Sequence, residues 1–408
     1  MMVVFQTSVA PFVQQVGQAF AEAGLLERFY TTLYAHADGP RGALAKILQV
    51  TGLTQRRMVR YIPADRINAF PLRELIRLAA GRIDSSGRLA DLAWESSEKS
   101  FARRVASRLR AGITGLYGYE FGARAAFVRA RELGIRTHYD VPAPEPNFVH
   151  GLLDAELDRF PEMRTSHDRF TRAKESRRTA HRQAEWELAD VVIAASHFTR
   201  ESFAQAGRDV AKVRVVPYGA PTPAPREDAL ARGRAPREEP LRFVWAGTFG
   251  VRKGAHYLLE AWRRGNFGRA ARLDIFGSVA LPARALSPLP AGVTVHGPIP
   301  HHRLVDELRA ADALIFPTLC DGFGMVATEA WSQGTPVLTT ARAGAFDFLR
   351  NGENGYLMEA ASSDAIEQAI TACIERPDQL RAMREAARET AARWQWSDYR
   401  KAIVQATQ

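Results

Sequence analysis

The second half of the chain alternates short apolar runs with helical segments, and this alternation restricts the possible folds more than any other feature. After Gly254 the pattern places Leu258, Ala261 and Trp262 on one helical face, and two further helical segments follow at 301–310 and 325–333. Strands that alternate with helices predict a parallel sheet covered by helices on both faces. The apolar runs lie at 241–248, 272–277, 293–297, 311–318 and 336–340.

The first half shows the same alternation less regularly. Helices separate its expected buried strands, which lie at 111–119, 135–142 and 189–196. Proline and charged residues gather at 221–240, where no apolar periodicity survives, so we place an interdomain linker there. The sequence therefore predicts two Rossmann-like α/β domains, residues 1–220 and 241–390.

The end of the chain, residues 391–408, carries three large aromatic residues, Trp394, Trp396 and Tyr399. So much aromatic surface usually docks on another part of a protein. We expect a helix here that packs back onto the first domain.

Composition excludes several classes of protein. At 408 residues the chain exceeds what one hydrophobic core usually organises, and 46% hydrophobic with 25% charged residues excludes disorder and fibres. Two cysteines, Cys320 and Cys373, fit a reducing compartment rather than a disulfide framework. Because no apolar run reaches the roughly 18 to 20 residues of a membrane-spanning helix and the start lacks positive charge, we expect a cytoplasmic protein.

The net charge of +10 is concentrated in the first half, where residues 1–220 hold 32 basic and 24 acidic side chains. Within it, 53–110 holds 13 basic and six acidic residues, interleaved with Leu72, Ile76 and other apolar residues. Two interpretations stay open for this stretch. It is either a basic amphipathic surface that rests on anionic lipid, or a solvated arginine-rich face.

The most informative segment is 314–338, where a strand, the loop Asp-Gly-Phe-Gly and a helix follow one another. Gly322 and Gly324 let the backbone approach a ligand, and the free N–H groups of the helix start suit a phosphate or a sugar oxygen. Asp321 and Glu329 lie eight positions apart and can face one crevice. Two carboxylates there suit a hydroxyl-rich ligand.

This segment resembles the E-x7-E region of glycosyltransferase family 4, whose members are retaining glycosyltransferases with the GT-B fold. The resemblance covers most of the chain, most strongly residues 189–358. It implies that Asp321, which stands where glutamate is usual, meets the hydroxyls of the transferred sugar, and that Glu329 binds the ribose. It also implies that the intervening backbone holds sugar and diphosphate, through Gly322, Phe323, Gly324, Met325 and Val326.

The segment 243–262 is again a strand, a glycine-containing loop and a helix, and it resembles the diphosphate-binding loop of the same family. A departing diphosphate gains charge, so cations are needed beside it. Lys253 is the first candidate and Arg252 the second, because Gly247 is followed by Thr248 where relatives commonly have arginine. The alternative is that Arg252 and Lys253 are only a charged helix start that binds no ligand. This alternative is disfavoured, because positive charges interact unfavourably with the dipole at a helix N-terminus.

Weaker matches to strand-end loops of the family occur at 213–220, 274–278 and 295–304. They imply that Gly277 and Ser278 line the nucleotide cleft and that Ile299 lies in the loop that contacts the base. His301 and His302 are interpreted as ordinary loop or helix-cap residues.

The acceptor side is less readable, because the loops before residue 189 diverge from the family. Residues 12–32 resemble the first helix and second strand of some members, without the Gly-Gly donor loop. Tyr119 and Glu120 come at the end of a predicted strand and are the acceptor-side candidates. Glu120 either helps to position the acceptor or is a solvated residue beside a turn.

The resemblance implies an enzyme that transfers a sugar, with retention, from a nucleotide-diphosphate sugar to a hydroxyl of a glycan, lipid-linked or other acceptor. It implies no cofactor and no metal, with Asp321, Lys253 and Arg252 as catalytic residues, and a role in cell-surface polysaccharide or glycoconjugate synthesis. An epimerase or phosphorylase on the same plan stays an alternative. A nucleic-acid-binding module, prompted by a pI near 9.9, is the least favoured.

Overall fold

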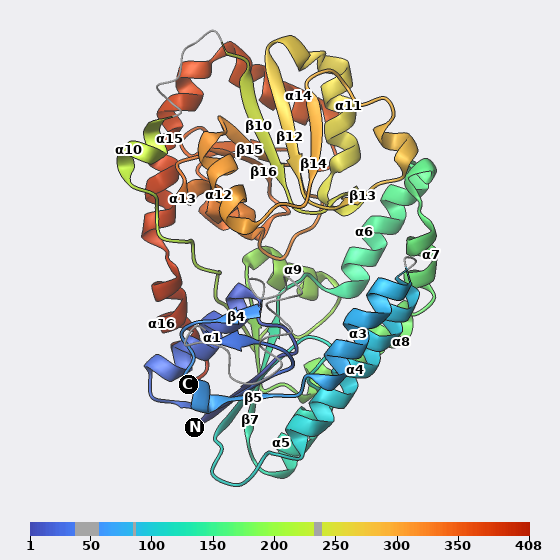
Figure 1. The fold of residues 1–408 in the computed structure, drawn as a ribbon, viewed down its shortest axis with the longest axis vertical. Helices are drawn as coiled ribbons and strands as arrows, with labels where there is room; N and C mark the ends of the chain where they lie inside the picture. The colour runs from blue at the N-terminus through green and yellow to red at the C-terminus, as the bar shows by residue number, and fades with distance from the viewer. Residues whose placement is uncertain (37–56, 85–86, 232–238) are drawn as a thin grey trace.

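The computed structural model describes residues 1–36, 57–84, 87–231 and 239–408, and it contains two large parallel sheets flanked by helices (Figure 1). The first half forms a seven-stranded sheet, in the order β5 (Ile67–Ala69), β2 (Leu26–Thr31), β1 (Met2–Phe5), β6 (Gly115–Tyr119), β7 (Arg136–Val141), β8 (Val191–Ala194) and β9 (Val213–Val215). The second half forms a six-stranded sheet, in the order β14 (Val293–Gly297), β12 (Ala271–Phe276), β10 (Leu241–Ala246), β15 (Ala313–Phe316), β16 (Val337–Thr340) and β17 (Gly355–Met358).

Two short parallel pairs lie outside these sheets. They are β3 (Ala35–His36) with β4 (Met58–Val59), and β11 (Phe249–Gly250) with β13 (Val279–Ala280). In both large sheets the first strand is central, and the strand order reverses direction beside it. This is the doubly wound arrangement, in which ligands bind beyond the carboxyl ends of the strands at the reversal.

Helices connect the strands. Those of the first half are α1 (Pro11–Glu22), α3 (Leu72–Ile83), α4 (Arg88–Ala106), α5 (Arg124–Glu132), α6 (Pro146–Arg159), α7 (Ser166–Arg172), α8 (Glu175–Leu188) and α9 (His197–Gln205). Those of the second half are α11 (Ala255–Gly265), α12 (His301–Ala310), α13 (Met325–Ser332), α14 (Ser363–Glu375), α15 (Pro377–Arg393) and α16 (Trp396–Ala406). None of the described helices combines the length and apolarity needed to cross a bilayer.

Apolar strands build the two cores. All six residues of β10 are buried, and β10 pairs in register with β12 from Leu241 opposite Ala271 to Ala246 opposite Phe276. Trp245 on β10 and Trp262 on α11 are among the largest fully buried side chains. Burial on both faces explains why these strands read as continuous apolar runs instead of alternating ones.

The last helix, α16, lies against α1 of the first half (Figure 1). Arg400 of α16 forms an ion pair with Glu22 of α1 at 2.7 Å. Trp394 lies in the break between α15 and α16, where its indole N–H donates to the Pro217 carbonyl at 2.9 Å. The aromatic end of the chain is thus attached to the first half.

The described part of the predicted linker contains one short helix, α10 (Arg226–Ala231), which packs on α15 and fully buries Ala229. This helix was not expected from the proline-rich and charged composition of 221–240. Residues 232–238 of that linker, and residues 53–56 and 85–86 of the arginine-rich stretch, lie outside the described residues.

Candidate active site

Two loops meet at the carboxyl edge of the second sheet, one after β10 and one after β15. These strands are neighbours at the point where the strand order reverses. Lys253 from the first loop and Asp321 from the second form an ion pair, and their side chains are 13% and 19% exposed. The predicted cation and the predicted carboxylate are therefore direct neighbours at the edge where such sheets bind ligands.

The environment of Lys253 keeps its ammonium group poorly hydrated. Burial lowers the pKa of Lys253, while the Asp321 carboxylate acts in the opposite direction. The ammonium also lies 5.2 Å from the centre of the Phe316 ring, on β15. A cation in this setting interacts strongly with any anion that enters.

The loop after β10 owes its shape to Gly254. A short 3-10 turn, Val251–Lys253, ends at Gly254, whose φ of 74° is unfavourable for other residues. A β-carbon at this position would also lie 2.1 Å from the Pro317 carbonyl oxygen. The Leu319 N–H donates to the Arg252 carbonyl at 3.0 Å and joins the two loops, while the Arg252 side chain is exposed.

A cavity of about 280 Å³ extends from this loop to the first half of the molecule. Thr248, Arg252 and Lys253 line one side, and residues of α6 and α7 line the other. A second cavity of about 220 Å³ adjoins it, since the two share Leu153, Leu157 and Asp168. The first cavity therefore lies between the halves, and the second, lined by residues of the first half alone, is its neighbour.

The second cavity is lined by charged groups of the first half. His150 contacts Glu175, and Arg172 forms an ion pair with Asp154. Burial lowers the pKa of His150 to about 4, so this imidazole is neutral near pH 7. Neutral imidazole and carboxylate oxygens are both able to accept hydrogen bonds from hydroxyl groups.

The loops after β10 and β12 touch through two glycines. Gly247 and Gly277 have φ angles of 121° and 133°, and a β-carbon on Gly277 would lie 1.9 Å from the Gly247 carbonyl oxygen. Beside them the hydroxyls of Thr248 and Ser278 lie 3.3 Å apart. The structure therefore brings these four predicted donor residues together.

The loop 321–324 is attached to the first half of the molecule. The Gly322 carbonyl accepts hydrogen bonds from the hydroxyls of Ser196 at 2.6 Å and Thr199 at 3.1 Å. Phe323 is buried and packs edge-to-face on Tyr218 at 5.3 Å, so its side chain belongs to the contact between the halves. Gly324, with a φ of 83°, precedes α13 and directs the first N–H groups of that helix toward the loop.

Glu329 of α13 has a partner that sequence reasoning missed. His301, the first residue of α12, lies 3.0 Å from the Glu329 carboxylate through its Nε2 atom. This hydrogen bond raises the pKa of His301. The position of His301 directly after the predicted base-contacting loop was the available signal. Ile299 in that loop is half-buried, and Met325 and Val326 are half-buried at the start of α13.

Tyr119 and Glu120 are not brought together with these residues. Tyr119 is buried in the core of the first half, beside Phe12. Glu120 forms an ion pair with Arg182 at 2.7 Å. Both residues line a small cavity within the first half, together with Trp186 and Arg208. Its side chain is 14% exposed, so the interpretation of Glu120 as a solvated residue is wrong.

The chain is similar in sequence to known glycosyltransferases. Residues 227–390 match the family model described as glycosyl transferases group 1. "D-inositol 3-phosphate glycosyltransferase 1" of Catenulispora acidiphila is 38% identical over 106 residues, 26% of this chain and 25% of that protein. The namesake enzyme of Xylanimonas cellulosilytica is 27% identical over 236 residues, 53% of this chain and 56% of that protein. The chain thus spans between a quarter and about half of these curated relatives.

Solved structures match over nearly the whole chain. Sucrose-phosphate synthase from Thermosynechococcus elongatus has a TM-score of 0.63 at 18% identity, covering 99% of this chain and 97% of the other. HepE from Anabaena, in complex with UDP-glucose, has a TM-score of 0.59 at 16% identity, covering 99% and 98%. These likenesses confirm the predicted fold, GT-B, with two Rossmann-like units facing each other across a cleft.

Proposed function

We propose that the protein is a retaining glycosyltransferase that moves a sugar from a nucleotide-diphosphate sugar to an acceptor hydroxyl. The observation that carries the proposal is the meeting of Lys253 and Asp321 at the carboxyl edge of the second sheet. Both residues lie inside the segment that matches the glycosyl transferases group 1 model. The UDP-glucose bound by HepE, a protein of the same fold, supports a nucleotide sugar as the donor.

Lys253 is proposed to stabilise the departing diphosphate. When the bond to the sugar breaks, negative charge grows on the phosphate oxygens, and a poorly hydrated cation stabilises that charge more strongly than water does. Arg252, exposed in the same cavity, and the N–H groups at the start of α13 add to this effect. We propose that these groups together supply the positive charge that the departing diphosphate needs, without a metal.

Asp321 is proposed to hold the transferred sugar. It is the partner of Lys253 in the structure, and the donor diphosphate takes its place beside the ammonium. The freed carboxylate then accepts hydrogen bonds from sugar hydroxyls. Retention of configuration is inferred from the family resemblance, and no carboxylate is assigned as a nucleophile.

The nucleoside is proposed to lie between the loops after β12 and β14. Gly277 allows close approach there, and Ser278 offers a hydroxyl. Glu329 accepts hydrogen bonds from the ribose, and His301 fixes the orientation of that carboxylate. Ile299 offers apolar surface to the base.

The acceptor is proposed to occupy the second cavity, rather than to contact Tyr119 or Glu120. This cavity shares Leu153 and Leu157 with the wall of the proposed donor cavity. Its His150, Asp154 and Glu175 suit a hydroxyl-rich acceptor. An acceptor bound there adjoins the cavity that contains Lys253.

A panel of nucleotide sugars tests the donor site by thermal unfolding. A donor present at about 100 times its Kd stabilises the folded state by about 2.7 kcal/mol and raises the midpoint. This stabilisation is expected to disappear in Lys253→Ala and Glu329→Ala, and to persist in the control Lys401→Ala, which changes an exposed lysine of α16. A folded protein that no nucleotide sugar stabilises would contradict the proposal.

Transfer is tested with the donor that binds, using sugars, polyols and D-inositol 3-phosphate as acceptors. The last is included because curated relatives carry it in their name. Asp154→Asn and Arg172→Gln are expected to raise the acceptor KM and to leave slow donor hydrolysis unchanged. Conversion of the donor to its epimer without an acceptor would instead show an epimerase.

A further inference from the structure

Helix α3 presents three of its large apolar residues to the solvent. Leu72, Ile76 and Ile83 are 61%, 54% and 81% exposed, and their spacing of four and seven positions places them on one face. The opposite face buries Glu74, while Leu75 and Leu78 pack on a small apolar cluster of the first half. A surface helix normally has a single apolar stripe, which faces the core. Helix α3 differs, because it has a second apolar stripe that faces the solvent.

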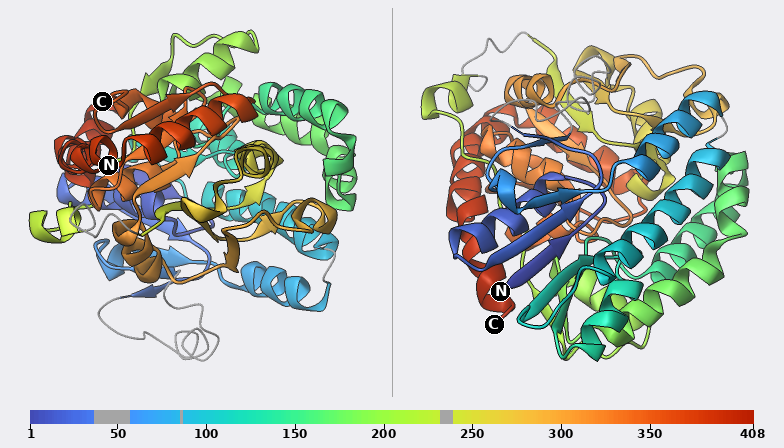
Figure 2. Two further views of the ribbon diagram at one scale, coloured as in Figure 1. Left: turned by 90° about the horizontal axis from the view of Figure 1, so that it is seen from above. Right: turned by 60° about the horizontal axis from the view of Figure 1, so that its bottom comes forward.

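Helix α4 extends this outward surface. Its Leu89 and Leu92 are 50% and 52% exposed. Arg73 of α3 donates to the Ser96 hydroxyl of α4 at 2.7 Å, in an exposed hydrogen bond across the two helices. Figures 1 and 2 show the two helices side by side at the periphery of the first half. We use the name α3–α4 face for seven of the exposed residues of this pair, Leu72, Arg73, Ile76, Arg82, Ile83, Leu89 and Leu92.

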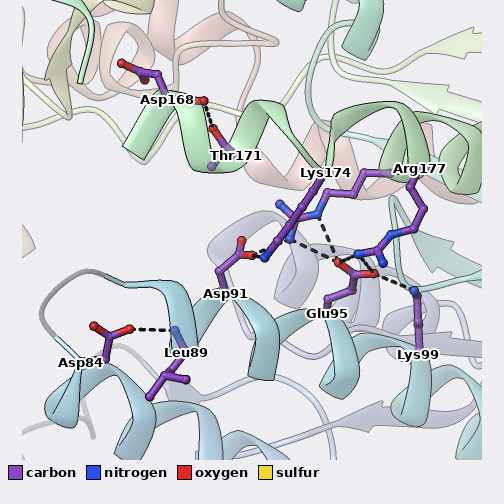
Figure 3. Close-up of polar contacts among 10 residues, drawn as sticks. Asp84, Leu89, Asp91, Glu95, Lys99, Asp168, Thr171, Lys174 and Arg177 are labelled. Carbon is purple, nitrogen blue, oxygen red and sulfur yellow. Dashed lines mark hydrogen bonds and ion pairs between the residues drawn. The ribbon is translucent and has the colours of Figure 1, made fainter. Parts of the chain in front are cut away.

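The acidic residues of these helices have partners within the protein. Glu74 pairs with Arg77 at 2.7 Å and also with Arg57, and Glu98 is buried and accepts from Thr7. Figure 3 shows how α4 is connected to the start of α8: Asp91 pairs with Lys174 at 2.7 Å, and Glu95 pairs with Arg177 and with Lys99 of α4 itself. The Asp84 carboxylate accepts from the Leu89 N–H at 2.8 Å. Each described carboxylate of the pair therefore has a partner within the protein.

Cations remain on the outer side. Arg73 comes directly after Leu72, and Arg82 comes directly before Ile83. At about 100° per residue the two arginines therefore lie on opposite sides of the apolar stripe of α3, and both are exposed. The α3–α4 face thus combines exposed apolar side chains with arginines, while Glu74, Asp91 and Glu95 of the same helices are paired with cations. Such a surface matches a bilayer with anionic headgroups, where apolar groups enter the acyl boundary and guanidinium groups meet phosphate.

We propose that the α3–α4 face docks on a lipid bilayer with anionic headgroups. A second copy of the chain is a poorer occupant, because a two-fold contact through this face would bring the arginines of both copies together. Docking would place the protein with α7 and the second cavity close to the membrane, since Arg88 of α4 stacks on Phe170 of α7. The inference stands independently of the proposed reaction.

Vesicle co-sedimentation of the full chain tests the docking. We expect binding to vesicles that contain phosphatidylglycerol, weaker binding at high salt, and little binding to pure phosphatidylcholine. Each arginine near an anionic surface contributes about 1 kcal/mol, so Arg73→Gln with Arg82→Gln should weaken partition about 30-fold. Ile76→Glu with Ile83→Glu should weaken it at least as much, since it removes apolar contact and adds negative charge.

The controls are Arg269→Gln and Leu357→Glu, which change exposed residues of the second half and should bind as the unchanged protein does. Circular dichroism checks that each variant is folded, and the two variant pairs test the face independently. Equal binding to neutral and anionic vesicles, or unchanged binding of both pairs, would overturn the proposal. A dimer that Ile76→Glu dissociates, without vesicle binding, would assign the face to self-association instead.

Discussion

Lys253 and Asp321, the proposed donor-site pair, are placed at a cost in stability. Each side chain is mostly buried, so each loses most of its hydration on folding and depends on the other for compensation. Removing one partner leaves an uncompensated charge, whereas replacing both with apolar groups does not. An apolar pair at these two positions would therefore stabilise the fold as well as the ion pair does. Because stability does not require the charges, their presence fits a ligand-binding role.

The first prediction concerns this pair. Asp321→Ala is expected to lower the free energy of unfolding by about 1–3 kcal/mol, somewhat less than for a fully buried pair, and the double variant Lys253→Met with Asp321→Leu should recover most of the loss. Urea unfolding measures the free energy of unfolding of the single and the double variant. The exposed pair Arg129–Glu132 on α5 is the matched control, and Glu132→Ala should change stability by about 0.5 kcal/mol or less. A double variant as unstable as Asp321→Ala would contradict the argument.

The second prediction concerns His301. Its hydrogen bond to Glu329 raises its pKa above the usual 6.5, so the pair stabilises the folded state fully below pH 6.5 and loses this contribution as the pH rises through the raised value. Glu329→Gln is expected to bring the pKa of His301 down. NMR titration of the imidazole measures this shift, with Glu375→Gln as the control. An unchanged titration in Glu329→Gln would show that the contact is absent in solution.

At the scale of elements, regular segments were predictable and long-range contacts were not. The helix expected at 301–310 has the bounds His301–Ala310, because strong periodicity and a preceding proline define it locally. Helix α10 was missed because its one fully buried residue, Ala229, packs on a helix about 150 residues later. The Glu120 partner, Arg182, is likewise distant in sequence, and composition carries no signal for such a pair.

The third prediction concerns the loop after β12. Gly277→Ala is expected to lower the free energy of unfolding by about 1–3 kcal/mol or more and to weaken nucleotide binding, because φ is 133° and the new β-carbon would meet the Gly247 carbonyl. Gly151→Ala, in the exposed part of α6, is the matched control and should be neutral or stabilising by up to about 1 kcal/mol. Chemical unfolding compares the two. Equal stability of both variants would contradict the close approach.

At the scale of the molecule, the loop that carries Asp321 depends on the first half for its position. The hydroxyls of Ser196 and Thr199, at the start of α9, hold the Gly322 carbonyl, and Phe323 packs on Tyr218. The C-terminal α16 provides a second connection, through α1. The first half therefore contributes to the proposed donor side as well as to the proposed acceptor side.

The last prediction tests that dependence. Ser196→Ala with Thr199→Val removes both donors from the buried Gly322 carbonyl, an unsatisfied group that costs about 1–3 kcal/mol. Amide hydrogen exchange in 321–324 should accelerate, and donor binding should weaken, while exchange in β10 stays slow because that strand is held by its own sheet. Ser363→Ala, which loses a hydrogen bond to Glu260 within the second half, is the control and should leave 321–324 unchanged. If exchange in 321–324 stayed unchanged in the double variant, the loop would hold its shape without the first half, and its attachment would serve only to join the domains.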